Sequence, residues 1–448
     1  MILRDYQITA IEGVRNAFRR HCRVCYVAPT GSGKTVQFAY MAAAAKHNTL
    51  ILVHRRELVT QTSAALTTPH GIIAAEWPMD LSHRVQVASV QTLTRRSLDW
   101  SPRFIIIDEA HHAAANTWQK VLDAYPEAKV LGVTATPCRM NRIGVGLGDI
   151  FDTLVQGPTY AELVSAGWIV QPRVFAPSAP NTDALRAIAG DYRRRDIETT
   201  MDRPTITGCA IEYYKKMADG KPAIAFCASV NHAENVAQQF RNAGYRSQRV
   251  DGGTPTETRD ALITGLATGA MDVLTSCDLI SEGVDVPVVE CGILLRPTRS
   301  LALYRQQVGR ILRSAPGKTE AIILDHAGNC YRHGLPHEDI DWNLDKGTPP
   351  RPKVAPVRQC AVCFYTHAPK PTCPNCGYEY PIKEREIEKV DGKLEEVKRI
   401  KRRQEGRAQT ANDLWKIAQE RGYKAGWVYH RLKARHGETT ARRMMKDE

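Results

Sequence analysis

The sequence lacks the long apolar stretches that a membrane protein needs. Its 448 residues contain no run of about eighteen apolar residues, so no segment is expected to span a bilayer. The first residues, which include Arg4 and Asp5, do not form the apolar stretch of a secretory signal peptide. We therefore expect no membrane association and a cytoplasmic location.

The cysteines lack the distribution of a disulfide-bonded protein. Of the twelve, eight are scattered singly or in the loose pair Cys22 and Cys25, and four cluster between positions 360 and 376. This usage is typical of a reducing compartment with one metal site. Cys22 and Cys25 have no second pair to complete a metal site and adjoin an apolar run, so we interpret them as buried core thiols.

Acidic residues are too few to balance the basic ones. The chain has 61 Lys and Arg against 48 Asp and Glu, a net charge of +13, and the segment 381–448 alone contains 19 basic against 12 acidic residues. Such a surplus favours a polyanionic partner, because neutralised phosphates release counterions. A basic protein without such a partner has the same balance, so charge alone leaves both possibilities open.

Two series of apolar runs alternate with helical stretches, which predicts parallel strands covered by helices on both faces. The first series comprises Arg23–Val27, Thr49–Val53, Phe104–Ile107 and Val130–Val133. The second comprises Ala223–Cys227, Val273–Ser276, Cys291–Leu295 and Ala321–Leu324. We therefore expect two α/β domains at 1–170 and 206–346, a connector at 171–205, a proline-rich linker and cysteine module at 347–380, and a basic helical region at 381–448.

The strongest local motif is Ala28-Pro29-Thr30-Gly31-Ser32-Gly33-Lys34-Thr35, between a predicted strand and a predicted helix. This is a P-loop in the expected context, although Ala28 replaces the first glycine of the strict pattern. The glycines let backbone amides surround phosphate oxygens at a helix N-terminus. Lys34 is predicted to neutralise the β- and γ-phosphates of a nucleotide, and the Thr35 hydroxyl to ligate Mg²⁺.

An acidic pair, Asp108 and Glu109, follows the buried run Phe104–Ile107. The carboxyl end of a central parallel strand is where ligands bind in such sheets. Asp108 is therefore predicted to hold Mg²⁺ through water, and Glu109 to orient or deprotonate the attacking water.

The run Asp108-Glu109-Ala110-His111 after a P-loop resembles the DEAH-box helicases of superfamily 2, and further motifs follow in order. The resemblance implies two tandem RecA-like domains and assigns nucleotide contacts to Arg4 and Gln7, with Gln7 reading the adenine base. Thr134-Ala135-Thr136-Pro137 resembles the motif that couples hydrolysis to strand contact. Gly283 and Asp285 lie in a segment similar to the fifth motif, and 306–313 matches the sixth, Gln-x-x-Gly-Arg-x-x-Arg.

The sixth motif also has a physical rationale. Gln306, Gly309, Arg310 and Arg313 recur at three- and four-residue steps, so they share one face of a helix. Two guanidiniums on that face are predicted to reach across an interdomain cleft to the γ-phosphate, as arginine fingers do. Gln306, Arg310 and Arg313 therefore join Lys34, Asp108 and Glu109 as candidate catalytic residues.

The family resemblance places nucleic-acid contacts on loops opposite the nucleotide cleft. The corresponding residues here are Arg55, Gln91, Thr92, Ser229, Asn231, Thr254 and Ser276. Small polar side chains at strand ends suit phosphate contacts that carry no base information. Capping or turn formation is the alternative role for any one of them.

Cys360, Cys363, Cys373 and Cys376 have the Cys-x2-Cys…Cys-x2-Cys spacing of a zinc ribbon. Four thiolates close the tetrahedron, so the predicted Zn²⁺ is structural, and His367 is not needed as a ligand. In the C-terminal region, Trp415, Tyr423, Trp427 and Tyr429 alternate with basic residues. Such aromatics either stack on bases or pack on the second α/β domain.

Together with the cysteine module and the tail, the run Leu324–Asn329 resembles the RadD-like helicases, bacterial and phage proteins associated with DNA repair and recombination. The resemblance implies an ATP- and Mg²⁺-dependent DNA helicase or translocase acting on single-stranded or branched DNA, with a single-strand-binding or recombination protein as a possible partner. Alternatives are an RNA helicase and a nucleotide-switched recruitment ATPase. A restriction-type nuclease is disfavoured, since no further carboxylate–lysine cluster appears.

Overall fold

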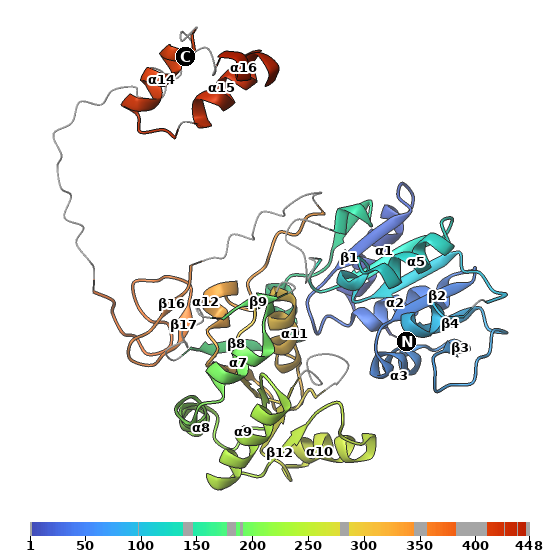
Figure 1. Ribbon diagram of the computed structural model, residues 1–448. Helices are drawn as coiled ribbons and strands as arrows, with labels where there is room; N and C mark the ends of the chain where they lie inside the picture. The colour runs from blue at the N-terminus through green and yellow to red at the C-terminus, as the bar shows by residue number, and fades with distance from the viewer. Residues whose placement is uncertain are drawn as a thin grey trace. The chain divides into compact units, whose positions relative to one another are not determined.

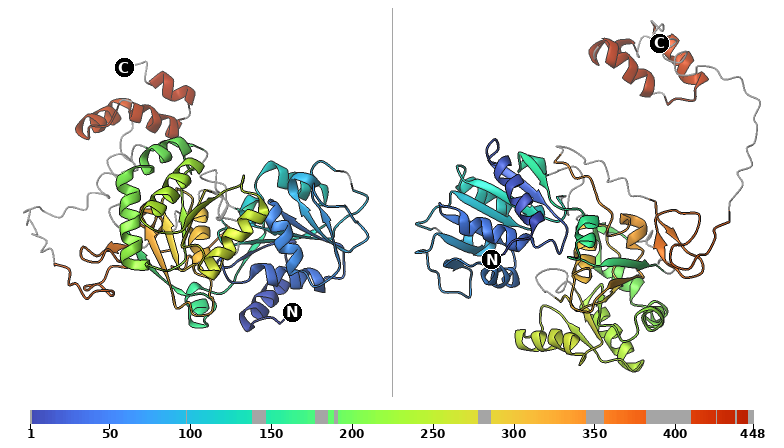
Figure 2. Two further views of the ribbon diagram at one scale, coloured as in Figure 1. Left: turned by 90° about the horizontal axis from the view of Figure 1, so that it is seen from below. Right: turned by 180° about the vertical axis from the view of Figure 1, so that it is seen from behind.

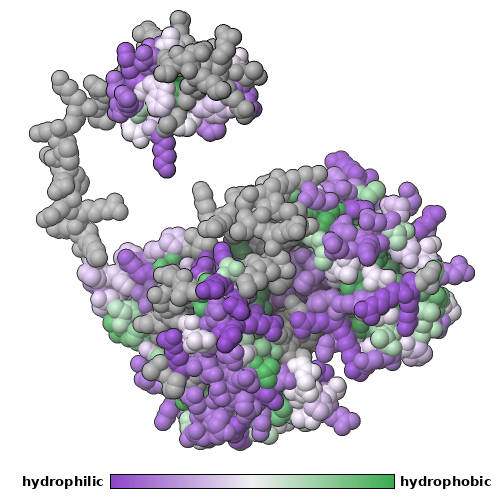
Figure 3. Space-filling view, in the orientation of Figure 1, coloured by the Kyte–Doolittle hydropathy of each residue, from purple (hydrophilic) through white to green (hydrophobic). Residues whose placement is uncertain are grey.

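The computed structural model divides the chain into two units, Met1–Tyr380 and Pro381–Glu448 (Figure 1). The structure describes residues 2–96, 98–137, 147–176, 185–188, 191–277, 286–344, 356–381, 410–424, 426–436 and 438–444. Among these residues, no helix is both long and apolar enough to cross a membrane. On the face drawn in Figure 3, hydrophilic residues predominate and hydrophobic residues form only small patches.

The first unit begins with a seven-stranded parallel sheet in the order β3-β4-β2-β5-β6-β1-β7. Its elements are α1 (Asp5–Ala17), β1 (Arg23–Val27), α2 (Lys34–Ala44), β2 (Thr49–Val53), α3 (Arg56–Ala65), β3 (His70–Ile73), β4 (Val85–Ser89), α4 (Val90–Leu93), β5 (Phe104–Asp108), η1 (Ala110–His112), α5 (Asn116–Ala124), β6 (Lys129–Thr134), η2 (Leu147–Asp149), β7 (Thr153–Gln156) and α6 (Tyr160–Ser165).

Successive residues of the central strands enter two different cores. Ile51 and Ile106 pack with α1, α2 and α3 on one face, whereas Leu50, Ile105 and Ile107 pack with α5 on the other. Side chains alternate between the faces of a strand, so a sheet buried on both sides requires nearly continuous apolar runs. This is why the four runs identified in the sequence are strands, with helices on both sides of the sheet (Figure 2).

A second parallel sheet has six strands in the order β12-β13-β11-β14-β15-β8. Its elements are β8 (Gln171–Phe175), β9 (Ala187–Ile188), β10 (Asp191–Tyr192), α7 (Arg194–Met201), α8 (Pro204–Ala218), β11 (Ala223–Phe226), α9 (Val230–Asn242), β12 (Ser247–Val250), α10 (Thr256–Thr268), β13 (Val273–Ser276), β14 (Cys291–Leu294), α11 (Leu301–Ile311), β15 (Glu320–Asp325) and α12 (Asn329–His333), with β9 and β10 forming a small hairpin.

The predicted connector at 171–205 is wrong at its start, because β8 is an edge strand of the second sheet. β8 pairs with β15, with Pro172 opposite Ala321. A proline donates no backbone hydrogen bond and is tolerated on an edge strand. Val174 and Phe175 enter the cores on opposite faces of the sheet. Residues 171–175 therefore belong to the second domain, ahead of the predicted boundary at 206.

The cysteine module adds the hairpin of β16 (Arg358–Gln359) and β17 (Thr366–His367). The C-terminal unit contains α14 (Ala411–Glu420), α15 (Gly426–His436) and α16 (Glu438–Met444). These three helices enclose their own core, which includes Leu414, Val428 and Leu432, and Trp415 and Trp427 pack against it. Part of the aromatic surface of the tail is therefore used to hold this small helical unit together.

Candidate nucleotide site and cysteine module

The P-loop joins β1 to α2. Gly31 and Gly33 have φ values of +91° and +73°, a backbone conformation that favours glycine. The loop lies so close to α1 that a Cβ on Gly33 would be 2.6 Å from the side-chain nitrogen of Gln7. The Nζ atom of Lys34 donates hydrogen bonds of 3.1 Å to the carbonyl oxygens of Ala28 and Pro29. The lysine is therefore held over the loop, where phosphate oxygens would replace these carbonyls.

The acidic pair lies at the carboxyl end of β5, beside the P-loop. Burial, followed by the neighbouring charge of Glu109, raises the pKa of Asp108 to about 7, and Lys34 opposes this shift. Burial also lowers the pKa of Lys34, an effect that Glu109 and Asp108 counteract. The lysine and both carboxylates therefore share one electrostatic environment.

Glu109 has the unusual backbone angles φ 51° and ψ 55°. Residues other than glycine rarely adopt this left-handed conformation, and it concentrates at functional sites. The conformation is held in part by a hydrogen bond of 3.0 Å from the Glu109 amide to Oδ1 of Asp108. It turns the chain at the junction of β5 and η1, where the two acidic residues lie.

His111, for which the sequence predicted no catalytic role, connects the acidic pair to the next strand. Nδ1 of His111 lies 3.4 Å from Oε2 of Glu109 and 3.1 Å from Oγ1 of Thr134. The Thr134 hydroxyl in turn accepts a hydrogen bond from the Thr136 amide. The acidic pair is thus linked to Thr134-Ala135-Thr136, the segment predicted to couple hydrolysis to strand contact.

Helix α11 of the second domain packs directly on the P-loop of the first. A Cβ on Gly309 would lie only 2.4 Å from Cβ of Thr30, so no larger residue fits there without separating the two elements. Arg313 and Arg310 both act on the pKa of Lys34, which their positive charge lowers. The predicted arginines therefore approach the predicted lysine, and residues of both domains meet at one site.

Gln306 lies on the same helix and is almost fully buried, at 2% exposure. Neither polar atom of its side-chain amide has a hydrogen-bond partner among the residues that the structure describes. A buried amide without partners is costly, and a ligand bound beside α11 would remove this cost.

The N-terminal nucleotide element lies against the other side of the P-loop. The Gln7 side chain accepts a hydrogen bond of 3.0 Å from the Arg4 amide, and the Tyr6 hydroxyl donates to the Ser32 carbonyl at 3.0 Å. The Arg4 guanidinium lies 3.4 Å from the centroid of the Trp168 ring. Trp168 was not identified from the sequence, because nothing local indicates that it faces Arg4.

The predicted nucleic-acid contacts differ in their surroundings. Gln91 is exposed and donates a hydrogen bond to the His54 carbonyl at 3.0 Å, whereas Ser276 is buried, at 1% exposure. The Ser229 hydroxyl caps α9 through the His232 amide, and the Thr254 hydroxyl accepts from the Asp251 amide in a turn. The remaining candidates have simpler placements, with Arg55 and Thr92 partly exposed and Asn231 exposed.

Two nucleotide-contact candidates, Gly283 and Asp285, lie outside the described residues. Thr35 follows Lys34 in the first turn of α2 and is partly exposed. Its role as a magnesium ligand stays a prediction.

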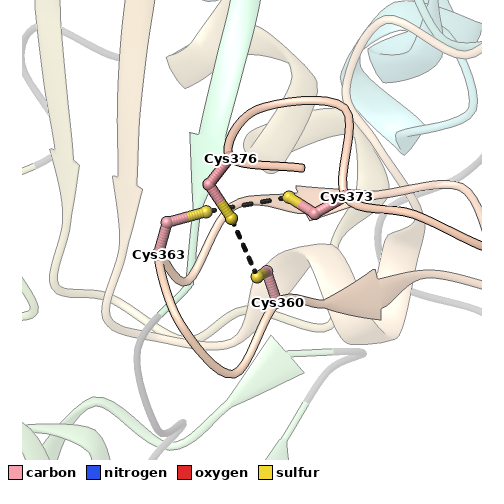
Figure 4. Close-up of side chains that lie close together, drawn as sticks. All are labelled: Cys360, Cys363, Cys373 and Cys376. Carbon is pink, nitrogen blue, oxygen red and sulfur yellow. Dashed lines mark hydrogen bonds between the residues drawn. The ribbon is translucent and has the colours of Figure 1, made fainter. Parts of the chain in front are cut away.

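The four clustered cysteines converge, as Figure 4 shows. Their sulfur atoms all lie within 4.8 Å of one another; Cys360 and Cys376 are 3.6 Å apart, and Cys363 and Cys373 are 3.7 Å apart. Tetrahedral Zn²⁺ with bonds of about 2.3 Å places its sulfur ligands ~3.8 Å from one another. The four thiols therefore have the clustering that a tetrahedral zinc site requires.

His367, which lies between the two cysteine pairs in the sequence, already has hydrogen-bond partners. The ring nitrogens of His367 contact the Ala368 carbonyl at 2.6 Å and the Tyr380 hydroxyl at 2.7 Å.

Cys25 is buried as predicted, but the prediction was wrong for Cys22, which is exposed because it precedes β1.

The cysteine module packs on β8. The Ala176 amide donates to the Phe364 carbonyl at 3.2 Å, Arg173 donates to the Asn375 side chain at 2.7 Å, and the Phe364 ring packs edge-on against Tyr213 at 5.6 Å. The module thereby extends the second domain.

Comparison with known proteins agrees with this arrangement. Residues 1–139 match the family described as type III restriction enzyme, res subunit, and residues 207–315 match the helicase conserved C-terminal domain. A 51.5 kDa protein of a Lactococcus phage (isolate 7-9) is 34% identical over 417 residues, which cover 88% of this chain and 87% of the phage protein.

Two further similarities are more distant. The ATP-dependent helicase IRC3, so named in Saccharomyces cerevisiae, is 29% identical over 357 residues, covering 73% of this chain and 52% of the yeast protein. The structure of the ATP-dependent type ISP restriction-modification enzyme LlaBIII bound to DNA has a TM-score of 0.55 and 19% identity, covering 72% of this chain and 27% of that enzyme. The chain thus spans about half of the yeast relative and about a quarter of the restriction enzyme.

Two parallel-sheet domains, the second of which contacts the P-loop of the first, have the tandem RecA-like arrangement of helicase ATPases. The chain belongs to the superfamily 2 helicases. It is an enzyme that hydrolyses ATP, and its family implies Mg²⁺ as the cofactor.

Proposed function

We propose that this enzyme is a DNA helicase or translocase that couples ATP hydrolysis to movement on single-stranded or branched DNA. The observation that carries the proposal is the contact of α11 with the P-loop, since the second domain must reach the nucleotide for hydrolysis to drive interdomain motion. The DNA-bound state of the similar restriction enzyme and the basic surplus of the chain support DNA as the track.

Each residue of the site has a distinct role in this proposal. Lys34 binds the β- and γ-phosphates, while Thr35 and Asp108 hold the magnesium ion, which neutralises phosphate charge when bound. Glu109 accepts the proton of the attacking water, with Nδ1 of His111 lying 3.4 Å from its carboxylate. Arg310 and Arg313 stabilise the charge of the transition state from the second domain.

We further assign Zn²⁺ to the four cysteines in a structural role. Within residues 356–380, which the structure describes, the module has two short strands of its own, and a fold of this size depends on a metal or another staple. The zinc ion would fix the knuckles that present Phe364 and Asn375 to the second domain.

The test is a panel of ATPase and unwinding assays on the purified full chain, with single-stranded DNA, forks, Holliday junctions, displacement loops and RNA hybrids. We expect DNA to stimulate hydrolysis and the chain to separate at least one DNA substrate. Glu109→Gln and Lys34→Ala should abolish both activities while far-ultraviolet circular dichroism remains unchanged. Stimulation by RNA alone would overturn the assignment to DNA.

A further inference from the structure

A surface pocket of about 450 Å³ lies on the first domain, and two of the predicted nucleic-acid contacts, Gln91 and Thr92, line it. Its volume falls in the range of ~300–1,000 Å³ typical of pockets that hold small organic groups. The side chains that give it its chemical character are Arg56, Trp77, Gln91, Thr92, Arg95 and Arg96. We call it the Trp77 pocket.

Trp77 is presented by the loop between β3 and β4, and this loop is firmly anchored. The side chain of Gln86 donates hydrogen bonds of 2.9 Å to the carbonyl oxygens of both Asp80 and His83. A Cβ on Gly71 would lie only 2.0 Å from the Asp80 carbonyl, so the loop packs directly on β3. The loop is therefore held against β3 and β4 at positions three and six residues beyond Trp77.

The indole of Trp77 is only partly buried. Part of the side chain packs against the core beneath the sheet, and the rest lines the Trp77 pocket. The Arg56 guanidinium lies 5.6 Å from the ring centroid. An aromatic ring that packs partly on a core and partly lines a pocket is suited to stacking on a planar group once a base displaces the Arg56 guanidinium from above it.

The charge of the Trp77 pocket is mainly positive. Arg56, Arg95 and Arg96 are exposed around it, and Glu76 is the carboxylate among its lining residues. Glu76 pairs with Arg56 at 2.8 Å, but both side chains are more than half exposed, at 55% and 58%. Because exposed pairs of this kind contribute little stability, a phosphate can replace Glu76 as the partner of Arg56.

We infer that the Trp77 pocket holds one base of single-stranded DNA, stacked on the indole of Trp77, with the flanking phosphates paired to Arg56, Arg95 and Arg96. The inference rests on the proposed function, because it requires a DNA strand that passes Gln91 and Thr92. It adds base stacking to a track otherwise made of phosphate contacts, which carry no information about whether a base is paired. A base must leave a duplex to enter the pocket, so this contact favours single strands over duplex DNA.

The experiment measures binding of single-stranded oligonucleotides that carry one 2-aminopurine at successive positions. With the wild type, stacking on the indole should quench the fluorescence at a defined position. Trp77→Ala should abolish this quenching and weaken binding about 5- to 150-fold, the range expected for one stacked base. Trp77→Phe, which keeps an aromatic ring, should retain most of the affinity.

Salt dependence separates stacking from phosphate contact. Arg96→Ala should reduce the slope of log affinity against log salt by about 0.7, the value for one phosphate contact on a single strand, whereas Trp77→Ala should leave the slope unchanged. Trp342→Ala is the matched control, since Trp342 is another partly buried tryptophan that packs on the first domain and does not line the Trp77 pocket.

The outcomes distinguish this inference from the proposed function. If the wild type neither binds single-stranded DNA nor shows DNA-stimulated ATPase activity, the proposed function itself fails. If the wild type binds but Trp77→Ala matches Trp342→Ala in affinity, or retains the position-specific quenching, the pocket does not hold a base and only this inference is overturned.

Discussion

Gly309→Ala tests the contact between α11 and the P-loop. The added Cβ would lie 2.4 Å from Cβ and 2.8 Å from Cγ2 of Thr30. Carbon atoms in contact prefer separations of about 3.5–4.0 Å, so helix and loop must move apart by roughly 1 Å. The displacement falls directly on Arg310, the next residue of the helix.

The expected effect on catalysis follows from that displacement. Arginine fingers contribute about 10³–10⁵ in rate, and a misplacement of ~1 Å costs on the order of 10²-fold. We therefore expect Gly309→Ala to lower the kcat of DNA-stimulated ATP hydrolysis about 100-fold. ATP affinity should change much less, because the P-loop itself is intact.

The assay is steady-state ATP hydrolysis with saturating single-stranded DNA, with nucleotide affinity measured separately by fluorescent-analogue titration. The matched control is Gly208→Ala in α8, where an added Cβ meets nothing within 4 Å and should slightly favour the helix. Wild-type turnover by Gly309→Ala would refute the reasoning, since the two domains would then hydrolyse ATP without this close packing.

Three other perturbations test separate parts of the structure. Cys373→Ser should lower the zinc content below one ion per chain in atomic absorption, whereas Cys22→Ser should leave it unchanged; full zinc in the first variant would contradict the assigned site. Lys318→Met removes the hydrogen bonds that Nζ donates to the carbonyl oxygens of Pro287, Val289 and Ile311. The free energy of unfolding, measured in urea, should therefore fall by ~1–3 kcal/mol or more, and an unchanged urea midpoint would contradict this role of Lys318. Burial lowers the pKa of His326 from 6.5 to about 4, so the folded chain binds fewer protons than the unfolded chain between these two pH values. The free energy of unfolding should therefore fall as the pH drops from 6.5 to 4, by up to ~3 kcal/mol. His326→Phe should flatten this pH dependence in thermal unfolding, and a pH profile identical to that of the wild type would contradict the argument.

The strands that were predicted from the sequence are buried on both faces of the sheet. A strand such as β5, with Ile105, Ile106 and Ile107 buried on both faces, needs apolar residues at every position, and this requirement is visible locally. Residues 171–175 were assigned to a connector because Pro172 opens a stretch that also contains Pro177, Pro180 and Pro204. The position of β8 at the sheet edge, which tolerates Pro172, depends on pairing with β15, about 150 positions later in the chain.

In the candidate site, too, some residues are marked by a local sequence pattern and others are not. Lys34 was identified from the P-loop motif, Asp108 and Glu109 from the buried apolar run that they follow, and the arginines from their repeat along one helix face. The contacts of His111 with Thr134 and of Arg4 with Trp168 join distant segments, so no local pattern marks them. The Trp77 pocket likewise requires β3, β4 and α3 to be placed side by side before Trp77 and Arg56 meet.

The most direct measurement of the central claim is the turnover of Arg310→Ala in the presence of single-stranded DNA, alongside its affinity for ATP. If ATP is hydrolysed at one site formed by both domains, kcat should fall at least ~10³-fold while ATP still binds through the P-loop. Turnover close to that of the wild type would show that the second domain takes no part in the chemistry and would contradict the account.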